Sequence, residues 1–373
     1  MLNSLFKYTT FRPDTFEDLL FRGTQKYALN DPFELTPGSG EHPPSLNPEV
    51  AYFDYSVFSL SETNNNLLMW AHYANEHKGI VIEFDTSRRI FSREYYKNQR
   101  VLRFIDDVSS SEYEHFPNEP MYIQGFDEEV VIDLEATNNY RLVSPGTQHR
   151  VLYNPDRPDF AKYNNRLDHF MVKSDAWIYE KEHRIILPLT DVDKLVIAPK
   201  HEQLITDSFW LHGDLEKKRQ GNSLHISNPQ DVIINELMES TRGAYIHMYR
   251  NKFEQFNEIC ELLKYTRYST FLFELSKDSS SIFLYKANPG AIKGVYMGCR
   301  MLEEDKIKLK EILENNPMFR HVELYESKAS KTRFELDFNP VLSNRNANLL
   351  GPQPNSFFLT QIIQRKVLEL TLA

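Results

Sequence analysis

Short apolar stretches with strand-like spacing, spread over most of the chain, constrain its fold more than any other feature. Residues 55–61 alternate between polar and apolar side chains, whereas residues 80–84 are almost wholly apolar. Alternation is typical of a strand with one buried face, and a continuous apolar run is typical of a strand buried on both faces. Further strands are expected at residues 5–10, 26–29, 101–105, 177–187, 271–275, 282–286, 294–298, 322–326 and 333–338.

Fewer segments have helical spacing. Residues 64–66 are three asparagines that can cap a helix over residues 67–77, and Gly79 suits the left-handed residue that closes it. Pro13 opens another helix, which we expect to end at Gly23. Additional helices are predicted at residues 160–173, 232–264, 303–314 and 360–370, with loops over residues 106–158.

The length of 373 residues accommodates two domains, or one domain with a large insertion. We predict a core formed by residues 1–188 and 289–338, and a C-terminal tail over residues 339–373. Residues 189–288 differ in character, because the long amphipathic stretch they contain requires a partner surface. We therefore expect a mostly helical insertion there, which either regulates access to the site or forms the contact of a homo-oligomer.

Composition excludes several classes of protein. The net charge of −10 argues against a broad nucleic-acid-coating surface. The chain has 2 cysteines, too few for a disulfide framework, so a reducing cytoplasm is the expected location. No apolar run reaches the roughly 18 residues of a membrane span, and residues 1–6 are too short for a signal-peptide core.

The motif whose side chains best suit catalysis is Tyr-Glu-Lys-Glu-His-Arg at residues 179–184. On an extended segment, Glu180, Glu182 and Arg184 share one face, with the two carboxylates roughly 7 Å apart. Such a pair can steady a cationic sugar while the second carboxylate orients or deprotonates a nucleophile. The alternative is a solvated strand edge with a mixed ion pair.

Two weaker motifs lie nearer the N-terminus. Ser59 and Ser61 share a strand face and can hold a ribose or orient a carboxylate, or they simply end an ordinary strand. Residues 30–34, Asn-Asp-Pro-Phe-Glu, favour a tight turn that bonds its own backbone. We assign this turn a structural role, although it can also line a pocket.

The helix expected at residues 67–77 is rich in aromatic side chains. Trp70, Tyr73 and His77 lie on one side of it. His72 and His77 are five residues apart and so are poorly placed to chelate one metal. Either this is an aromatic core helix with a polar edge, or His72 or Tyr73 borders a ligand cleft.

Motifs for P-loop ATPases, Rossmann dehydrogenases, zincins and serine hydrolases are absent from the sequence. Glu304 and Lys306 match half of a metal-nuclease motif, without an evident partner aspartate. A metal-dependent nuclease is therefore the least favoured of the functions considered, and no metal site is predicted.

Five motifs occur together in one order: residues 5–9, residues 30–34, residues 68–79, residues 179–185, and residues 296–306. In this combination the chain resembles the bacterial family called domain of unknown function 2971. The resemblance covers residues 5–338 in pieces, with long unmatched insertions. The family name implies no activity.

The motif order is also similar, more distantly, to that of ADP-ribosyltransferases, which place an Arg or His, then a Ser or Tyr, then a Glu on successive strands. Here Lys7 and Tyr8 stand at the first position, Ser59 and Ser61 at the second, and Glu180 and Glu182 at the third. The first element departs from the pattern, because it is Lys-Tyr rather than Arg or His. The number of residues between Ser61 and Glu180 is also larger than the pattern has.

This second resemblance implies an α+β fold in which two small, mostly antiparallel sheets form a cleft, with a helical insertion. It implies NAD as substrate, with Glu182 binding the ribose and Glu180 orienting an acceptor that is a protein or a nucleic acid. Lys7 or Tyr8 would meet the adenosine or phosphate side. Trp70, His72, Tyr73 and Arg184 complete the residues expected around NAD.

By analogy, such an enzyme can serve as a toxin or an anti-phage effector. The competing class is a non-catalytic protein that binds a nucleotide or a partner through the same cleft.

Overall fold

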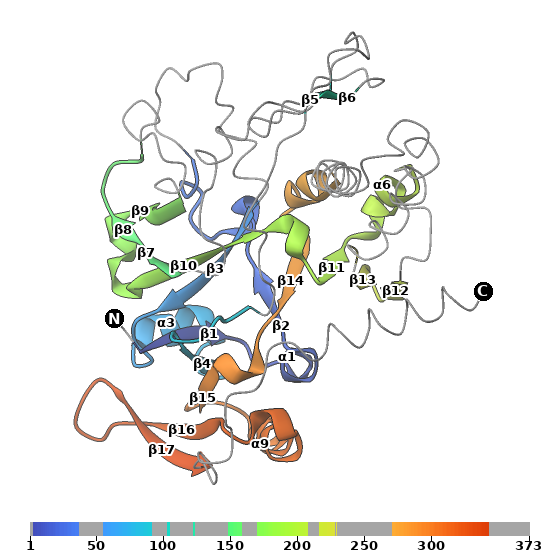
Figure 1. Cartoon of the computed structure of the whole chain (residues 1–373). Helices are drawn as coiled ribbons and strands as arrows, with labels where there is room; N and C mark the ends of the chain where they lie inside the picture. The colour runs from blue at the N-terminus through green and yellow to red at the C-terminus, as the bar shows by residue number, and fades with distance from the viewer. Residues whose placement is uncertain are drawn as a thin grey trace.

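The computed structural model describes residues 3–36, 55–91, 103–104, 122–123, 148–158, 170–207, 216–227, 229 and 271–342. Figure 1 shows the arrangement of their helices and strands. The helices predicted at residues 232–264 and 360–370 lie outside the described residues, as does most of the predicted loop over residues 106–158.

Eight strands form the larger sheet, in the order β17-β16-β15-β4-β1-β3-β10-β7. Neighbouring strands are antiparallel except β15 and β16, which run parallel because helix α9 (Glu303–Asn315) carries the chain back between them. The strands of this sheet are β1 (Ser4–Thr9), β3 (Tyr55–Ser61), β4 (Ile80–Asp85), β7 (Gln148–Arg150), β10 (Glu182–Pro188), β15 (Ile292–Met297), β16 (Glu323–Ala329) and β17 (Leu336–Leu342).

The second sheet has five strands, in the order β12-β13-β11-β14-β2. It joins β2 (Leu20–Gly23) to β11 (Lys194–Ile197), β12 (Glu216–Gln220), β13 (Ser223–Ser227) and β14 (Ile282–Lys286). Within the described part of the predicted insertion, residues 189–288, β11 to β14 belong to this sheet, and the helical segments include α6 (Glu202–Asp207) and residues 271–276. The described part is thus not mostly helical, contrary to the prediction. Two strand pairs are small: β5 (Arg103–Phe104) with β6 (Tyr122–Ile123), and β8 (Leu152–Tyr153) with β9 (Val172–Lys173).

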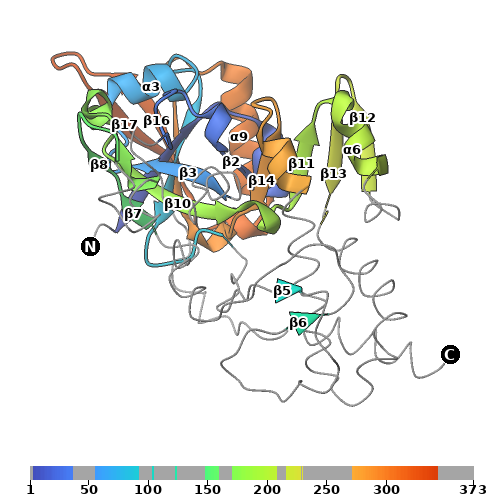
Figure 2. The same cartoon turned by 90° about the horizontal axis from the view of Figure 1, so that it is seen from above.

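Helices cover both faces of the larger sheet (Figure 2). On one face, Trp70 of α3 (Leu67–Tyr73) packs on Tyr8 and Val81. On the other, α1 (Pro13–Asp18) and α9 lie close together, and the ring of Phe16 meets that of Phe319 edge-on with centroids 5.9 Å apart. The chain is therefore α+β with open, mostly antiparallel sheets, as predicted at that level, although the larger sheet is not small.

Local backbone conformation corrects several predicted boundaries. Helix α1 ends at Asp18 rather than Gly23, because Leu19 takes a left-handed conformation with φ of 56°, which frees the next residues to enter β2. Residues 26–28 form a 3₁₀ turn, not a strand. Residues 271–276 are helical and so do not form a hairpin with residues 282–286. Val172 and Lys173 belong to β9 rather than to a helix ending at residue 173.

Two glycines allow a close approach between turns that are distant in sequence. The reversal after α3 is made by Asn75, Glu76 and His77, all with positive φ, so the left-handed role predicted for Gly79 is wrong. A Cβ on Gly79 would lie 2.4 Å from the carbonyl oxygen of Thr9, and one on Gly298 would lie 2.1 Å from that of His77. The two motifs around residues 68–79 and 296–306 therefore interlock through bare backbone.

No helix within the described residues has the length and apolar character needed to cross a membrane.

We predict that Gly298→Ala lowers the free energy of unfolding by about 2–3 kcal/mol, because the added methyl group collides with backbone that cannot move freely. Urea denaturation measures the loss. Gly290→Ala is the matched control, since its Cβ would meet only side-chain atoms, at 3.2 Å. An equal effect at both positions would contradict the assigned close approach.

Candidate functional site

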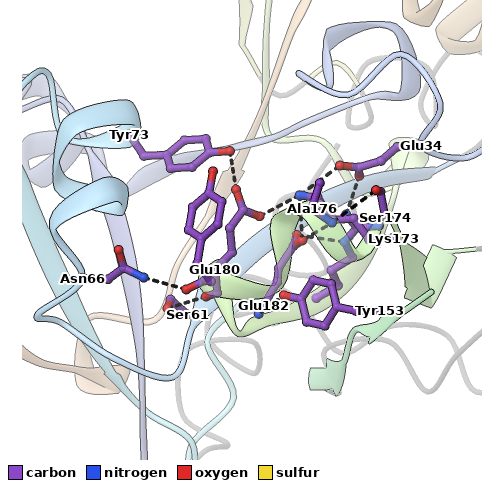
Figure 3. A network of polar contacts seen from close by, with 12 residues as sticks. Glu34, Ser61, Asn66, Tyr73, Tyr153, Lys173, Ser174, Ala176, Glu180 and Glu182 are labelled. Atoms are coloured by element: carbon purple, nitrogen blue, oxygen red, sulfur yellow. Dashed lines mark hydrogen bonds and ion pairs between the residues drawn. The ribbon is translucent and has the colours of Figure 1, made fainter. Parts of the chain in front are cut away.

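Five charged side chains meet beside β10 of the larger sheet, and we call them the charge cluster. They are Glu34, Lys173, Glu180, Glu182 and Arg184, and each exposes 7% or less of its surface. Figure 3 shows four of them, Glu34, Lys173, Glu180 and Glu182, converging. Burying five ionisable groups is costly unless each is paired and hydrogen-bonded, so their mutual contacts determine what this site can do.

Lys173 is the common partner of the three carboxylates. Its Nζ lies 3.0 Å from Oε1 of Glu34, 2.7 Å from Oε2 of Glu180 and 3.1 Å from Oε2 of Glu182. The same nitrogen lies 5.0 Å from the ring centroid of Trp177, within the range of a cation–π contact. One ammonium group therefore ties together three chain segments.

Arg184 is completely buried and supplies the second positive charge. Its Nε donates to Oε1 of Glu182 at 2.8 Å, and Nη2 donates to Oε2 of Glu182 at 3.1 Å. Nη2 also donates to Glu34, while Nη1 donates to the carbonyl of Phe170 at 2.7 Å. All of these contacts are internal, so Arg184 holds Glu182 and Glu34 in place.

The backbone between the two carboxylates differs from the predicted strand. Residues Asp175–Glu180 form a 3₁₀ helix, and Lys181 follows with a left-handed φ of 45°. The strand β10 begins only at Glu182. The prediction that Glu180 lies on a strand is therefore wrong, and the left-handed residue replaces strand geometry in directing both carboxylates toward Lys173.

The two serines contact this motif, as their shared strand face predicts. Ser61 lies opposite Glu182 and Ser59 opposite Arg184 in the pairing of β3 with β10. The buried hydroxyl of Ser61 donates to the carbonyl of Glu180 at 2.7 Å. The side chain of Ser59 hydrogen-bonds Glu182. Ser61 thus fixes the backbone of the turn and Ser59 the carboxylate that follows it.

Two tyrosines complete the polar contacts. The hydroxyl of Tyr73 donates to Oε1 of Glu180 at 2.5 Å, and Figure 3 shows its ring extending toward Glu180. The hydroxyl of Tyr153 accepts from the backbone N–H of Glu182 at 2.8 Å. Asn66 joins the same region by donating to the carbonyl of Tyr179 at 2.6 Å.

The environment drives the pKa values of the two adjacent carboxyls apart. Burial raises the pKa of Glu182, but the charges of Arg184 and Lys173 outweigh it and hold that pKa at about 2. Burial is also the main influence on Glu180, and with the nearby charge of Glu182 it raises the pKa of Glu180 in spite of Lys173. Glu182 is therefore the permanent anion, and Glu180 is the better proton acceptor or donor.

The remaining predicted residues lie around the cluster with different roles. Lys7 lies on the opposite face of β1 from Tyr8, and its Nζ donates to the carbonyl of Ser59 at 3.0 Å. Burial is the main reason that the pKa of Lys7 falls to about 8. The Tyr8 hydroxyl donates to the carbonyl of Thr63 at 2.7 Å, Trp70 is completely buried in the core, and His72 is exposed.

Sequence reasoning missed Glu34, Lys173 and Tyr153. Glu34 belongs to the Asn-Asp-Pro-Phe-Glu turn, to which we assigned a structural role, so a signal was present but was not connected to the site. Lys173 and Tyr153 lie in segments read as a helix and a loop. Their recruitment depends on the pairing of β8 with β9, which no local pattern indicates.

The metal-nuclease alternative gains no support from the geometry. Lys306 forms ion pairs with Glu326 at 2.7 Å and Glu303 at 3.3 Å, away from the charge cluster. Within the described part of the chain, no three His, Cys, Asp or Glu side chains are grouped to hold a metal ion.

Comparison with known protein families gives a match over part of the chain. Residues 69–185 match the family model described as protein of unknown function (DUF2971). The matched segment contains Tyr73, Lys173, Glu180, Glu182 and Arg184, whereas Glu34 and both serines precede it. No curated protein and no solved structure matches the chain. Because the match spans about a third of the chain, it supports the expected resemblance to this family without extending it to the whole protein.

We predict that Arg184→Met lowers the free energy of unfolding at pH 7 by about 3–5 kcal/mol, because Glu34 and Glu182 are left with too little positive charge. In the wild type the pKa of Glu182 is about 2 in the native state and 4.5 in the unfolded chain, so ionised Glu182 stabilises the native state at pH values above 4.5. This contribution to stability is lost as the pH falls toward about 2. The variant lacks much of that contribution, so the difference between the two proteins should narrow as the pH falls below about 5.

Urea denaturation at pH 7 and pH 4 tests this. Arg150→Met is the control, because Arg150 pairs with Glu62 at 3.0 Å but is 67% exposed, and its loss should cost less than about 1 kcal/mol. A pH-independent difference for Arg184→Met would show that lost packing, not charge, is responsible.

Proposed function

We propose that the protein is an ADP-ribosyltransferase-like enzyme that cleaves NAD at the nicotinamide–ribose bond, with Glu182 and Glu180 as its catalytic carboxylates. The observation that carries the proposal is the order of adjacent strands. β1, β3 and β10 are neighbours in one sheet, and they bear Lys7, the two serines and Glu182 in the order that the transferase resemblance requires.

The charge at the site suits this reaction. Three carboxylates face two cations in the cluster, so one negative charge remains when every group is ionised. Cleavage of the nicotinamide–ribose bond builds positive charge on the sugar, and a fixed anion stabilises that transition state more than the ground state. Glu182 is such an anion, because its low pKa keeps it ionised and its contacts hold it still.

Glu180 takes a different role in the proposal. Its raised pKa and its hydrogen bond to Tyr73 suit a group that exchanges a proton with the attacking nucleophile. The nucleophile is water in NAD hydrolysis, or a protein or nucleic-acid group in transfer. A role as a toxin or anti-phage effector rests on analogy with other NAD-consuming enzymes.

One observation favours the competing, non-catalytic function. Each of the six carboxylate oxygens of the cluster already contacts a donor inside the protein. A cluster whose oxygens are all paired in this way can act without catalysis, by fixing the fold around a nucleotide- or partner-binding surface. The two functions differ in whether nicotinamide is released.

We predict that Glu182→Gln lowers NAD cleavage by about 10²-fold or more, the scale seen when one preorganised electrostatic group is removed. Glutamine keeps the size of the side chain, but its amide nitrogen cannot accept from Arg184 or Lys173. The loss therefore reports on catalysis when NAD binding, measured in parallel, is retained. Glu180→Gln should impair transfer to an acceptor more than hydrolysis. Labelled NAD, incubated with and without cell extract, reports both nicotinamide release and label on macromolecules.

Glu326→Gln is the matched control, because Glu326 also pairs with a lysine but lies on β16, away from the cluster. If the wild type neither binds NAD nor releases nicotinamide, even with extract, the non-catalytic function replaces the proposal. If activity is present but indifferent to Glu182→Gln, the site assignment is wrong.

A further inference from the structure

The turn formed by residues 30–35 supplies one member of the charge cluster, Glu34, and also contacts Tyr73 next to the cluster. Glu34 bonds both cations of the cluster, Lys173 and Arg184. At the other end of the turn, the side chain of Asn30 hydrogen-bonds Tyr73, the tyrosine that donates to Glu180. The turn therefore reaches the groups that contact both proposed catalytic carboxylates.

The backbone of this turn is held in an unfavourable conformation. Leu35 has a left-handed φ of 52°, which costs a branched, non-glycine residue roughly 1–2 kcal/mol. Asp31 caps the turn by accepting from the N–H of Phe33 at 2.8 Å. Leu35 itself is buried against Phe170 and Ile186. Such an outlier persists only where surrounding contacts enforce it, and here they direct Glu34 inward.

Glu34 competes with the catalytic carboxylates for the same positive charge. Its Oε1 lies 3.0 Å from Nζ of Lys173, which also bonds Glu180 and Glu182. Its Oε2 accepts from the same Nη2 of Arg184 that donates to Glu182. Without Glu34, two carboxylates would share two cations, and both cations could move toward Glu180 and Glu182.

We propose that Glu34 is a positioning residue for the Glu180–Glu182 pair, which acts by withholding part of the positive charge of Lys173 and Arg184 from that pair. The effect of Glu34 on catalysis rests on the proposed function, whereas its effect on the charge around Glu180 does not. The Asn-Asp-Pro-Phe-Glu turn then belongs to the proposed active site and is not only structural.

The effect is measurable at Glu180. The charged and titratable side chains around Glu180 are Lys173, Glu182, Tyr73, Tyr153, Tyr179 and Lys7. Of these, Lys173 is the cation in direct contact with both Glu180 and Glu34. When Glu34 loses its charge, Lys173 interacts more strongly with ionised Glu180, and the pKa of Glu180 falls.

The experiment is a carboxyl-carbon NMR titration of the full chain labelled at glutamate, with the Glu180 signal assigned by its loss in Glu180→Gln. We expect the pKa of Glu180 to be lower in Glu34→Gln than in the wild type. Glu34→Asp, whose carboxylate is one methylene too short to bridge both cations, should shift it the same way and provides the test if Glu34→Gln does not fold. An unchanged pKa in a folded Glu34 variant overturns the proposal.

Glu62→Gln is the matched control, because Glu62 also accepts from two basic side chains, Arg150 and His183, both at 3.0 Å, but lies outside the cluster. An equal shift in this variant would overturn the assignment to Glu34. If the wild type cleaves NAD, Glu34→Gln should lower kcat by up to about 10²-fold with little change in KM, since it misplaces reacting groups. If the wild type does not cleave NAD, the proposed function fails while the titration still decides the role of Glu34.

Discussion

The ammonium group of Lys173 lies within 3.1 Å of carboxylates from three separate segments, the turn before β3, the 3₁₀ helix and β10. A buried lysine is stable there because those carboxylates surround it, and the buried carboxylates in turn require the positive charges of Lys173 and Arg184. Position and charge are therefore mutually dependent. The site is a single electrostatic unit, and no residue of the cluster has a role independent of the others.

In the larger sheet, β1 and β3 are only partly joined. These strands pair at one position, Phe6 with Ser61, and Lys7 supplies a hydrogen bond to the carbonyl of Ser59. Beyond that point the pairing of β3 with β10 brings the serines beside Glu182 and Arg184. Glu182 and Arg184 thus lie on β10 beside β3, while Lys7 approaches β3 from β1 on its other side.

Sequence patterns predicted those parts of the structure that depend on local periodicity. The period of two placed Glu182 and Arg184 on one face, and the register of β3 confirms it. The approach of Glu180 could not be predicted this way, because it requires a left-handed Lys181, a conformation that lysine rarely adopts. Glu34 reaches Arg184 across 150 residues, and such contacts arise from tertiary packing rather than from any pattern along the chain.

The most direct test of the central claim is a crystal structure of the full chain with a hydrolysis-resistant NAD analogue. The account predicts the nicotinamide ribose within hydrogen-bonding distance of Glu182, beside Ser59, with Lys173 still bonded to Glu34 and Glu180. An analogue bound elsewhere on the protein, or a charge cluster unchanged and without ligand at saturating analogue, would contradict it and leave the cluster as a purely structural feature.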